Sequence, residues 1–233
     1  MLSHYVQESG VTGGWLALAA LGLAVVAYFL GCFNGAVVVS RYILRNDVRN
    51  HGSGNGGLTN FYRTFGGPLT AVVILSDVVK AVLAVLFGVL IANMISPVLV
   101  PVAKYWTGMF CLLGHMFPCT FQFRGGKGIL SGGTIAFMLD WRVALVVWGG
   151  FLILAVITRY VSLGSCWAGL SFPFVSAFVY QDTLITLIAT VLGALILWKH
   201  RGNIQRIVQG NESKFSFHRK GAQDAPQDEE EGT

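Results

Sequence analysis

Charged residues are scarce in this sequence. Only 12% of its 233 residues are Asp, Glu, Lys or Arg, whereas 54% are hydrophobic. An ordinary soluble domain carries about 25% charged residues. The mean hydropathy of +0.64 is correspondingly high. This composition excludes an ordinary soluble domain, and we predict an integral membrane protein.

The sequence also lacks the cysteine patterns of a disulfide framework or a zinc site. It contains no CxxC pair, and its cysteines all fall in or beside apolar runs, as Cys32, Cys111, Cys119 and Cys166. Such positions are typical of small buried side chains. We therefore expect no bound metal and no cofactor. The first residues show neither the basic segment nor the cleavage site of a signal peptide, so the first apolar run is expected to be retained as a span.

A basic-aromatic pattern of the kind that binds nucleic acid is missing as well. The net charge is +5, but the basic residues flank apolar runs instead of lining a soluble face. Anionic lipid headgroups and membrane orientation explain this arrangement better than nucleic acid does. We expect membrane lipids as partners and no nucleic acid.

Long apolar segments fill most of the chain. A membrane-spanning helix needs about 20 apolar residues, and the sequence predicts an all-α polytopic membrane protein with about seven transmembrane helices in one bundle. They are expected at residues 15–43, 69–95, 102–121, 129–139, 143–158, 162–179 and 183–198. The first is longer than one perpendicular span requires and is interrupted at Gly31 and at Asn34-Gly35, which indicates a tilted or kinked helix. Residues 129–139 are too short to span alone and indicate a partial or re-entrant segment, or one extended through the preceding glycine motif.

One transmembrane domain is expected over residues 1–220. The remaining residues, 221–233, are acidic and contain proline, which is typical of a disordered tail. The Lys and Arg residues beside the spans are unevenly distributed. Of sixteen, only Lys104 and Arg142 fall on one side, and Lys80 falls inside a span. Because cytoplasmic loops are enriched in Lys and Arg, we expect the N-terminus outside and the C-terminus in the cytoplasm.

The most informative polar stretch is residues 50–63, between two apolar runs. Its glycines permit backbone dihedrals closed to other residues, so that successive amide N–H groups can converge on an anion. Arg63 adds a charged fork suited to phosphate, and neutral hydrogen-bonding groups come from Ser53, Asn55, Thr59 and Asn60. The stretch therefore predicts a phosphate site. A flexible, solvated linker is the alternative interpretation.

A second constellation of glycines and cations follows at residues 123–128, after Gly114-His115 and Pro118. It does not match the nucleotide-binding P-loop, because Gly128 follows Lys127 where that motif has Ser or Thr. Within the segment 69–95, Asp77 and Lys80 lie three residues apart and share a helix face. A charge facing lipid is costly, so both are expected to point into the bundle. They form either a structural ion pair or a support for the site.

These motifs together resemble the bacterial membrane glycerol-3-phosphate acyltransferases that use acyl phosphate as donor. The resemblance is nearly end to end. It is carried by Asp47-Val48-Arg49 through Gly52-Ser53-Gly54-Asn55-x-Gly57-x-Thr59-Asn60-x-x-Arg63, by Gly114-His115-x-Phe117-Pro118 with Phe123-x-Gly125-Gly126-Lys127-Gly128, by Arg159-Tyr160-Val161-Ser162-Leu163-x-Ser165, and by His200-Arg201-x-Asn203-Ile204-x-Arg206 with Gly210-x-Glu212. The chain departs from the family pattern at Gly56 and Leu58, at residues 31–34 and at residues 129–131.

The resemblance implies transfer of a fatty acyl group from acyl phosphate to the 1-hydroxyl of glycerol 3-phosphate, in the bacterial plasma membrane, with the active site at the cytoplasmic face. Ser53, Arg63 and Lys127 are the implied catalytic residues. The implied substrate-binding residues are Gly52, Gly54, Asn55, Gly57, Thr59, Asn60, His115, Gly125, Gly126, Ser165, His200 and Asn203. His115 either contacts substrate or braces the second motif. Glu212 is expected to be structural and to pair with a basic neighbour of the final helix.

Three alternatives stand beside this interpretation. A nucleophilic Ser53 is one, although no G-x-S-x-G elbow is present. A transporter or channel for organic phosphates is another, since charges within membrane helices and broken helices suit transport too. A lipid-binding scaffold without chemistry is the third, and it requires the polar motif residues to be dispensable.

Overall fold

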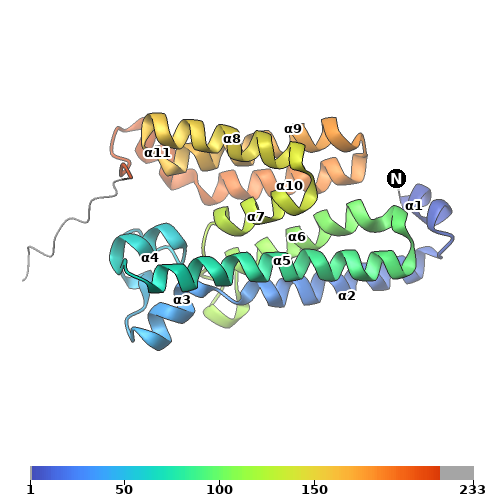
Figure 1. Ribbon diagram of the computed structural model, residues 1–233, viewed down its shortest axis with the longest axis horizontal. Helices are drawn as coiled ribbons and strands as arrows, with labels where there is room; N and C mark the ends of the chain where they lie inside the picture. The colour runs from blue at the N-terminus through green and yellow to red at the C-terminus, as the bar shows by residue number, and fades with distance from the viewer. Residues whose placement is uncertain (1, 216–233) are drawn as a thin grey trace, which may run out of the picture.

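The computed structural model describes residues 2–215, and every regular element in this range is a helix (Figure 1). The acidic tail predicted at residues 221–233 lies outside the described residues. The α-helices are α1 (Leu2–Ser9), α2 (Gly13–Cys32), α3 (Gly35–Val38), α4 (Leu58–Thr64), α5 (Leu69–Ile95), α6 (Val100–Met116), α7 (Ile129–Leu139), α8 (Trp141–Thr158), α9 (Val161–Tyr180), α10 (Thr183–Lys199) and α11 (Arg201–Val208).

The predicted all-helical membrane architecture is confirmed, whereas the exact number of spans, expected to be about seven, stays a prediction. Five segments within residues 2–215 are long and apolar enough, and a sixth is added if α10 and α11, which meet at a 54° bend, count as one. Helix α7 has only 11 residues, which reach about 16 Å, half the thickness of the hydrocarbon core. The sequence had indicated this segment as partial, and its length agrees.

The long helices form two layers. Helices α2, α5 and α6 pack against one another in one layer, and α8, α9 and α10 form the other, with α7 between them (Figure 1). The largest buried apolar cluster joins both layers and includes Tyr105, Leu112, Ile135, Phe172 and Leu192. The N-terminal helix α1 lies at the opposite end of the molecule from α4 and α11. The motif-bearing segments are thereby gathered at one end of the bundle.

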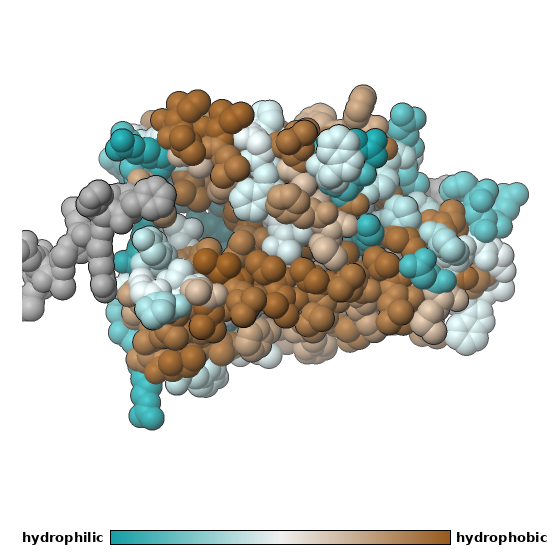
Figure 2. All heavy atoms as spheres, viewed as in Figure 1, coloured by the Kyte–Doolittle hydropathy of each residue, from teal (hydrophilic) through white to brown (hydrophobic). Residues whose placement is uncertain are grey.

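An apolar surface runs along the outer side of the first layer (Figure 2). Helix α5 contributes exposed large side chains at Leu75, Val79, Leu83, Leu86 and Leu90. Exposing an apolar surface of this length to water would be unfavourable, whereas lipid tails solvate it. The exposed side of α5 therefore fits the hydrocarbon interior of a membrane.

Helices α2 and α6 cross closely because small residues meet at the crossing. A Cβ atom on Gly31 would overlap the backbone carbonyl of Cys111, and one on Gly114 would overlap the carbonyl of Tyr28. Between membrane helices the hydrophobic effect contributes little, so close backbone packing supplies much of the attraction. This pair of glycines sets the distance between the two helices.

The predicted kink in the first apolar run is confirmed as a break between α2 and α3. At the break, Asn34 accepts a hydrogen bond from the Val37 amide at 3.1 Å and donates one to the Gly56 carbonyl at 2.9 Å. The first bond caps α3, as Asn commonly does at a helix start. The second ties the broken helix to the first glycine motif.

The polar stretch 50–63, where no helix was predicted, contains the start of a short helix. Helix α4 begins at Leu58, and Phe61 within it is fully buried against a cluster that includes Val48 and Val73. A seven-residue helix is too short to be stable alone, and tertiary packing stabilises it. Helices α1 and α11 were also not predicted, each having only eight residues.

We predict that Gly114→Ala lowers stability because its Cβ would collide with backbone in α2. Overpacking of this kind typically costs about 1–3 kcal/mol. Denaturant unfolding in detergent micelles measures the loss. The matched control is Gly22→Ala, at a helical position with no atom within 4 Å of the added Cβ, which should be as stable as the parent or gain up to about 1 kcal/mol. Equal stability of the two variants would contradict the close crossing.

Candidate functional site

A polar cavity of about 220 Å³ opens between the two layers at the end that carries α4 and α11. Many of the residues singled out from the sequence line it: Asn55, Gly57, Thr59, Asn60, Arg63, His115, Lys127, Ser165, His200 and Asn203. Four motifs that are far apart in the chain thus contribute to one cavity. Ser53, Gly52, Gly54, Gly125 and Gly126 are not among its lining residues.

The loop that begins the first motif is held by its own hydrogen bonds. Gly52 and Gly54 have φ values of +55° and +68°, which suit glycine. The Ser53 amide donates to the side chain of Asn60 at 3.1 Å, and the Gly54 amide donates to the His51 carbonyl at 2.9 Å. These two amides are engaged within the protein, and an anion nest formed by other amides of the loop stays a prediction. The Ser53 residue itself is exposed.

Asn60 organises this loop from within. It is 5% exposed, and its amide nitrogen lies 3.0 Å from each of the carbonyls of Val48, His51 and Asn55. Together with the bond that it accepts from Ser53, these contacts fix the loop on the start of α4. Direct contact of Asn60 with substrate stays a prediction, and its contacts favour a bracing function.

Glycines of the first and second motifs bring two backbones together. A Cβ on Gly126 would lie 3.0 Å from the Gly56 carbonyl oxygen, and one on Gly56 would lie 3.4 Å from the carbonyl carbon of Gly125. The Gly126 amide also donates to the His115 carbonyl at 3.1 Å. These contacts leave no room for side chains, so glycine is needed here for close approach of the two loops.

A chain of polar side chains runs from Lys127 to Glu212. The Lys127 ammonium donates to the side-chain oxygen of Asn203, whose amide donates to Glu212 at 2.7 Å. Glu212 also accepts from Ser162 at 2.7 Å and pairs with Arg206 at 2.8 Å. The expected pairing of Glu212 with a basic residue of the final helix is therefore present. The carboxylate fixes Asn203, which in turn orients Lys127.

Glu212 and Ser162 also line the cavity, although neither had been assigned to the site. Both fall within motifs seen in the sequence, Gly210-x-Glu212 and residues 159–165, and that was the signal available. Burial alone would raise the pKa of Glu212, but hydrogen bonds from Asn203, Ser162 and Arg206 outweigh it and lower the pKa. The residue is therefore a carboxylate near neutral pH.

Burial lowers the pKa of Lys127 to about 8, and the nearby Arg206 charge acts in the same direction. A lysine with this pKa is mostly charged at pH 7. An anion placed in the cavity would favour the charged form further. Arg63, the second cation of the cavity wall, is exposed and makes a long contact of 3.4 Å to the Ser213 carbonyl.

His200 enters the cavity wall at the bend between α10 and α11. Its Nδ1 lies 2.8 Å from the Ile196 carbonyl oxygen, and since a carbonyl only accepts, Nδ1 carries the proton. Within residues 2–215, Nε2 has no hydrogen-bond partner and is therefore free to meet a ligand. Ser165 donates its hydroxyl to the Val161 carbonyl at 2.9 Å.

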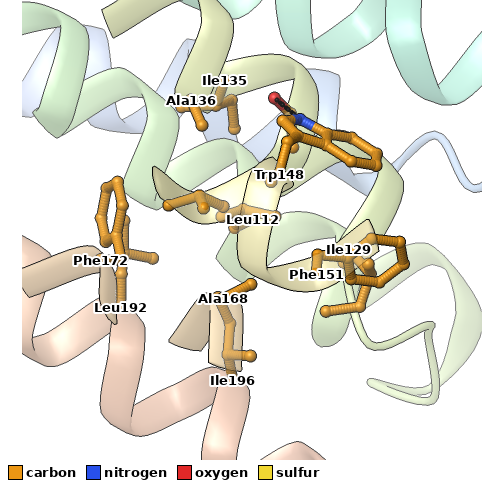
Figure 3. Close-up of a pocket in the computed structure, with 14 residues that line it drawn as sticks. Leu112, Ile129, Ile135, Ala136, Trp148, Phe151, Ala168, Phe172, Leu192 and Ile196 are labelled. Carbon is orange, nitrogen blue, oxygen red and sulfur yellow. Dashed lines mark hydrogen bonds between the residues drawn. The ribbon is translucent and has the colours of Figure 1, made fainter. Parts of the chain in front are cut away.

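An apolar pocket of about 40 Å³ adjoins the polar cavity (Figure 3). The two share four wall residues: Gly128, Ile129, Trp148 and Phe151. Beyond this shared wall, side chains from α6, α7, α9 and α10 surround the pocket, among them Leu112, Ala136, Phe172 and Leu192. A charged cavity next to an apolar one suits a ligand with an anionic head and an apolar tail.

Comparison with known proteins gives a consistent result. A family model described as glycerol-3-phosphate acyltransferase matches residues 21–210. The glycerol-3-phosphate acyltransferase of Thermoanaerobacter pseudethanolicus is 34% identical over 192 residues, which cover 82% of this chain and 93% of that protein. The enzyme of the same name from Bacillus subtilis is 33% identical over 195 residues, covering 84% and 97%.

Solved structures show the same similarity. The crystal structure of an integral membrane glycerol 3-phosphate acyltransferase in its glycerol 3-phosphate form is 34% identical, with a TM-score of 0.75, and the match covers 85% of this chain and 96% of that one. A lysophosphatidic acid form gives 33% identity and a TM-score of 0.72.

We predict that sulfate binds more weakly as the pH rises from 7 to 9, because Lys127 loses its charge around its pKa of about 8. The pKa is lowered, so the charge is present below pH 8 and lost above it, and the affinity should fall roughly tenfold by pH 9. Titration calorimetry at fixed ionic strength measures this, and sulfate does not itself titrate in the window. In Lys127→Arg, whose guanidinium stays charged, the affinity should not change with pH. The same decline in both proteins would rule out Lys127 as the titrating group.

Proposed function

The chain belongs to the glycerol-3-phosphate acyltransferase family, and we propose that it transfers a fatty acyl group from acyl phosphate to the 1-hydroxyl of glycerol 3-phosphate. The products are lysophosphatidate and inorganic phosphate. The observation that carries this proposal is the junction of the cavity lined by Arg63 and Lys127 with the apolar pocket. Both proposed substrates carry phosphate, and one also carries an acyl chain.

The cations and amides of the cavity match the phosphate groups of the two substrates. Lys127 is the more buried cation and is held by Asn203, so it is placed to stabilise charge on a phosphate in a partly dehydrated site. Arg63 presents several donors in a planar fork, which suits two phosphate oxygens at once. His200 and Asn203 lie across the cavity from the first motif and orient the acceptor.

The reaction needs no covalent enzyme intermediate. An acyl phosphate is a mixed anhydride, so the glycerol hydroxyl oxygen attacks the acyl carbonyl carbon, the bond from that carbon to the phosphate oxygen breaks, and inorganic phosphate leaves. The hydroxyl proton passes to a phosphate oxygen of the donor. The protein contributes positioning and charge stabilisation. Since Ser53 does not line the cavity, this route is favoured over nucleophilic attack by Ser53.

The apolar pocket behind Ile129 and Trp148, with its volume of about 40 Å³, takes up part of the acyl chain (Figure 3). Gly132 of α7 provides some of its space, because a Cβ added there would have only the side chain of Leu112 near it, at 3.6 Å. The chain comes from lipid and not from water, so the pocket contributes position more than hydrophobic free energy while the phosphate end reacts.

The proposed membrane placement follows from the basic residues. They concentrate on the side of the glycine motifs, which we assign to the cytoplasmic face of a bacterial plasma membrane, with the N-terminus outside. A cysteine introduced at Leu58, in a background without the native cysteines, should react with an impermeant thiol reagent in inverted vesicles only. Reaction from the outside of intact cells would reverse this orientation.

The activity can be tested with purified protein in detergent. Given palmitoyl phosphate and labelled glycerol 3-phosphate, it should form labelled lysophosphatidate and release phosphate in equal amounts. Palmitoyl-CoA should not replace palmitoyl phosphate, because nothing in the sequence resembles a site for the adenine nucleotide. Product formation with acyl-CoA alone would overturn the proposed donor, and no product with either donor would overturn the proposed function.

Arg63→Lys and Lys127→Ala should each lose roughly ten- to a hundredfold of kcat/KM, the usual loss for one charge-assisted contact. Arg63→Lys keeps the charge but loses the fork. Steady-state kinetics with varied glycerol 3-phosphate separates acceptor binding, seen in KM, from transition-state stabilisation, seen in kcat. Arg41→Lys, at an exposed cation outside the cavity, is the control and should match the parent. If Arg63→Lys also matches the parent, its fork does not contact phosphate.

Gly132→Leu should shorten the acyl pocket, because the new side chain would enter it. We expect the rate with palmitoyl phosphate to fall more than the rate with decanoyl phosphate, measured as the ratio of their kcat/KM values. Gly149→Leu is the matched control, since Gly149 lies in α8 with no atom within 4 Å of an added Cβ and does not line the pocket. An unchanged ratio in well-folded Gly132→Leu protein would place the chain elsewhere.

A further inference from the structure

Three ionisable side chains form a buried cluster beside the cavity. Asp77 and Lys80 on α5 are 2% and 3% exposed, and His115 on α6 is 2% exposed. Asp77 and His115 belong to the cavity wall. Charges inside a membrane are costly and must be paired, and the predicted inward position of Asp77 and Lys80 is confirmed. Asp77 and Lys80 form the expected ion pair, at 2.6 Å. Lys80 also contacts His115, which lines the cavity.

The hydrogen bonds of Lys80 determine which nitrogen of His115 carries the proton. The Lys80 nitrogen lies 2.6 Å from Asp77 Oδ1, 2.9 Å from the Phe33 carbonyl oxygen and 2.7 Å from His115 Nδ1. With the Asp77 carboxylate as its counter-charge, Lys80 is an ammonium, which has three N–H donors and no acceptor. Each donor has one partner. His115 Nδ1 must therefore present its lone pair, and the proton of the neutral ring is on Nε2.

The Nε2 edge of His115 lies against the backbone of Gly126, and His115 belongs to the cavity wall. A Cβ on Gly126 would overlap Nε2, so glycine at this position leaves the edge of the ring uncovered by a side chain. Among residues 2–215, no side chain or backbone group accepts a hydrogen bond from Nε2. Gly126 is followed directly by Lys127, the cation of the cavity. The N–H group is thus a free donor next to the proposed phosphate position.

We propose that Lys80 and Asp77 are positioning residues that hold His115 as its Nε2–H tautomer, so that it donates a hydrogen bond to a phosphate oxygen of bound substrate. The identity of that substrate rests on the proposed function, whereas the tautomer does not. The geometry also defines what Lys80 prevents. Asp77 Oδ1 lies 3.7 Å from His115 Nδ1, and without Lys80 the carboxylate would draw the proton to Nδ1 and leave Nε2 without it.

The tautomer can be measured directly in the intact protein. Nitrogen NMR of detergent-solubilised protein labelled with [15N]histidine distinguishes a protonated ring nitrogen from a bare one, and the His115 signals are assigned by their loss in His115→Gln. The parent should show a protonated Nε2 and a bare Nδ1. A protonated Nδ1, in either the neutral or the charged ring, overturns the proposal without need of any variant.

A pair of substitutions tests whether the Nε2–H group of His115 donates a hydrogen bond to bound phosphate. Glutamine places its amide N–H2 near the position of Nε2, whereas asparagine places its amide near Nδ1, where it can still contact Lys80. If His115 serves by donating into the cavity, His115→Gln should bind inorganic phosphate nearly as the parent does, and His115→Asn roughly tenfold more weakly. If His115 only braces Lys80, the order is reversed, and the proposal is wrong. Phosphate affinity by calorimetry does not depend on turnover, so this test remains valid if the acyltransferase assay fails.

Lys80→Met tests whether Lys80 determines the tautomer of His115. In this variant Asp77 should take the Nδ1 proton, and NMR should show the tautomer reversed together with a loss of phosphate affinity like that of His115→Asn. The double variant Asp77→Asn/Lys80→Met removes both charges, and its new amide can donate to Nδ1, which should restore the Nε2–H signal and much of the affinity. Folding is monitored by unfolding in detergent. Retention of the Nε2–H tautomer in folded Lys80→Met would show that Lys80 does not fix it.

Discussion

One ammonium group joins three helices at the centre of this protein. Lys80 on α5 contacts the Phe33 carbonyl at the end of α2 and His115 on α6. In the membrane interior no water is available to donate a hydrogen bond to the free carbonyl groups at a helix end, so a side chain of the protein must donate it. The break after α2 turns the chain toward the first glycine motif, where Asn34 binds Gly56. The path of the chain into the cavity therefore depends on a buried charge that is fully paired.

The sequence predicted the long apolar elements well because the membrane imposes their length. Helices α5 and α7 have the predicted bounds, and the Asn34-Gly35 pair marks the break in the first run. The segments missed are short. Helix α4 exists because Phe61 is buried by residues brought from elsewhere in the chain, and no local pattern of seven residues reveals such packing. The exact number of spans stays a prediction, because five segments within residues 2–215 are long and apolar enough to cross, and a sixth is added if α10 and α11 count as one.

For the candidate site, the motifs predicted which residues lie close together, but they did not predict whether each residue faces the cavity or holds another residue in place. Lys127, Asn203 and His200 do meet in one cavity. The glycines and Asn60, however, were interpreted as a phosphate cradle. Glycine serves equally for an anion nest and for close packing of two backbones. The approach of Gly126 to Gly56 shows close packing at that pair, and the nest stays a prediction. Glu212 has the expected structural role, and the residue that it fixes is Asn203.

The wall shared by the polar cavity and the apolar pocket has an evolutionary consequence. Among residues 2–215, only Gly128, Ile129, Trp148 and Phe151 belong to both spaces. The remaining residues of each space border one space only, so substitutions deep in the pocket leave the cations and their hydrogen bonds in place. If the acyl chain enters this pocket as proposed, its length preference can change through pocket residues while the cations that meet phosphate stay the same.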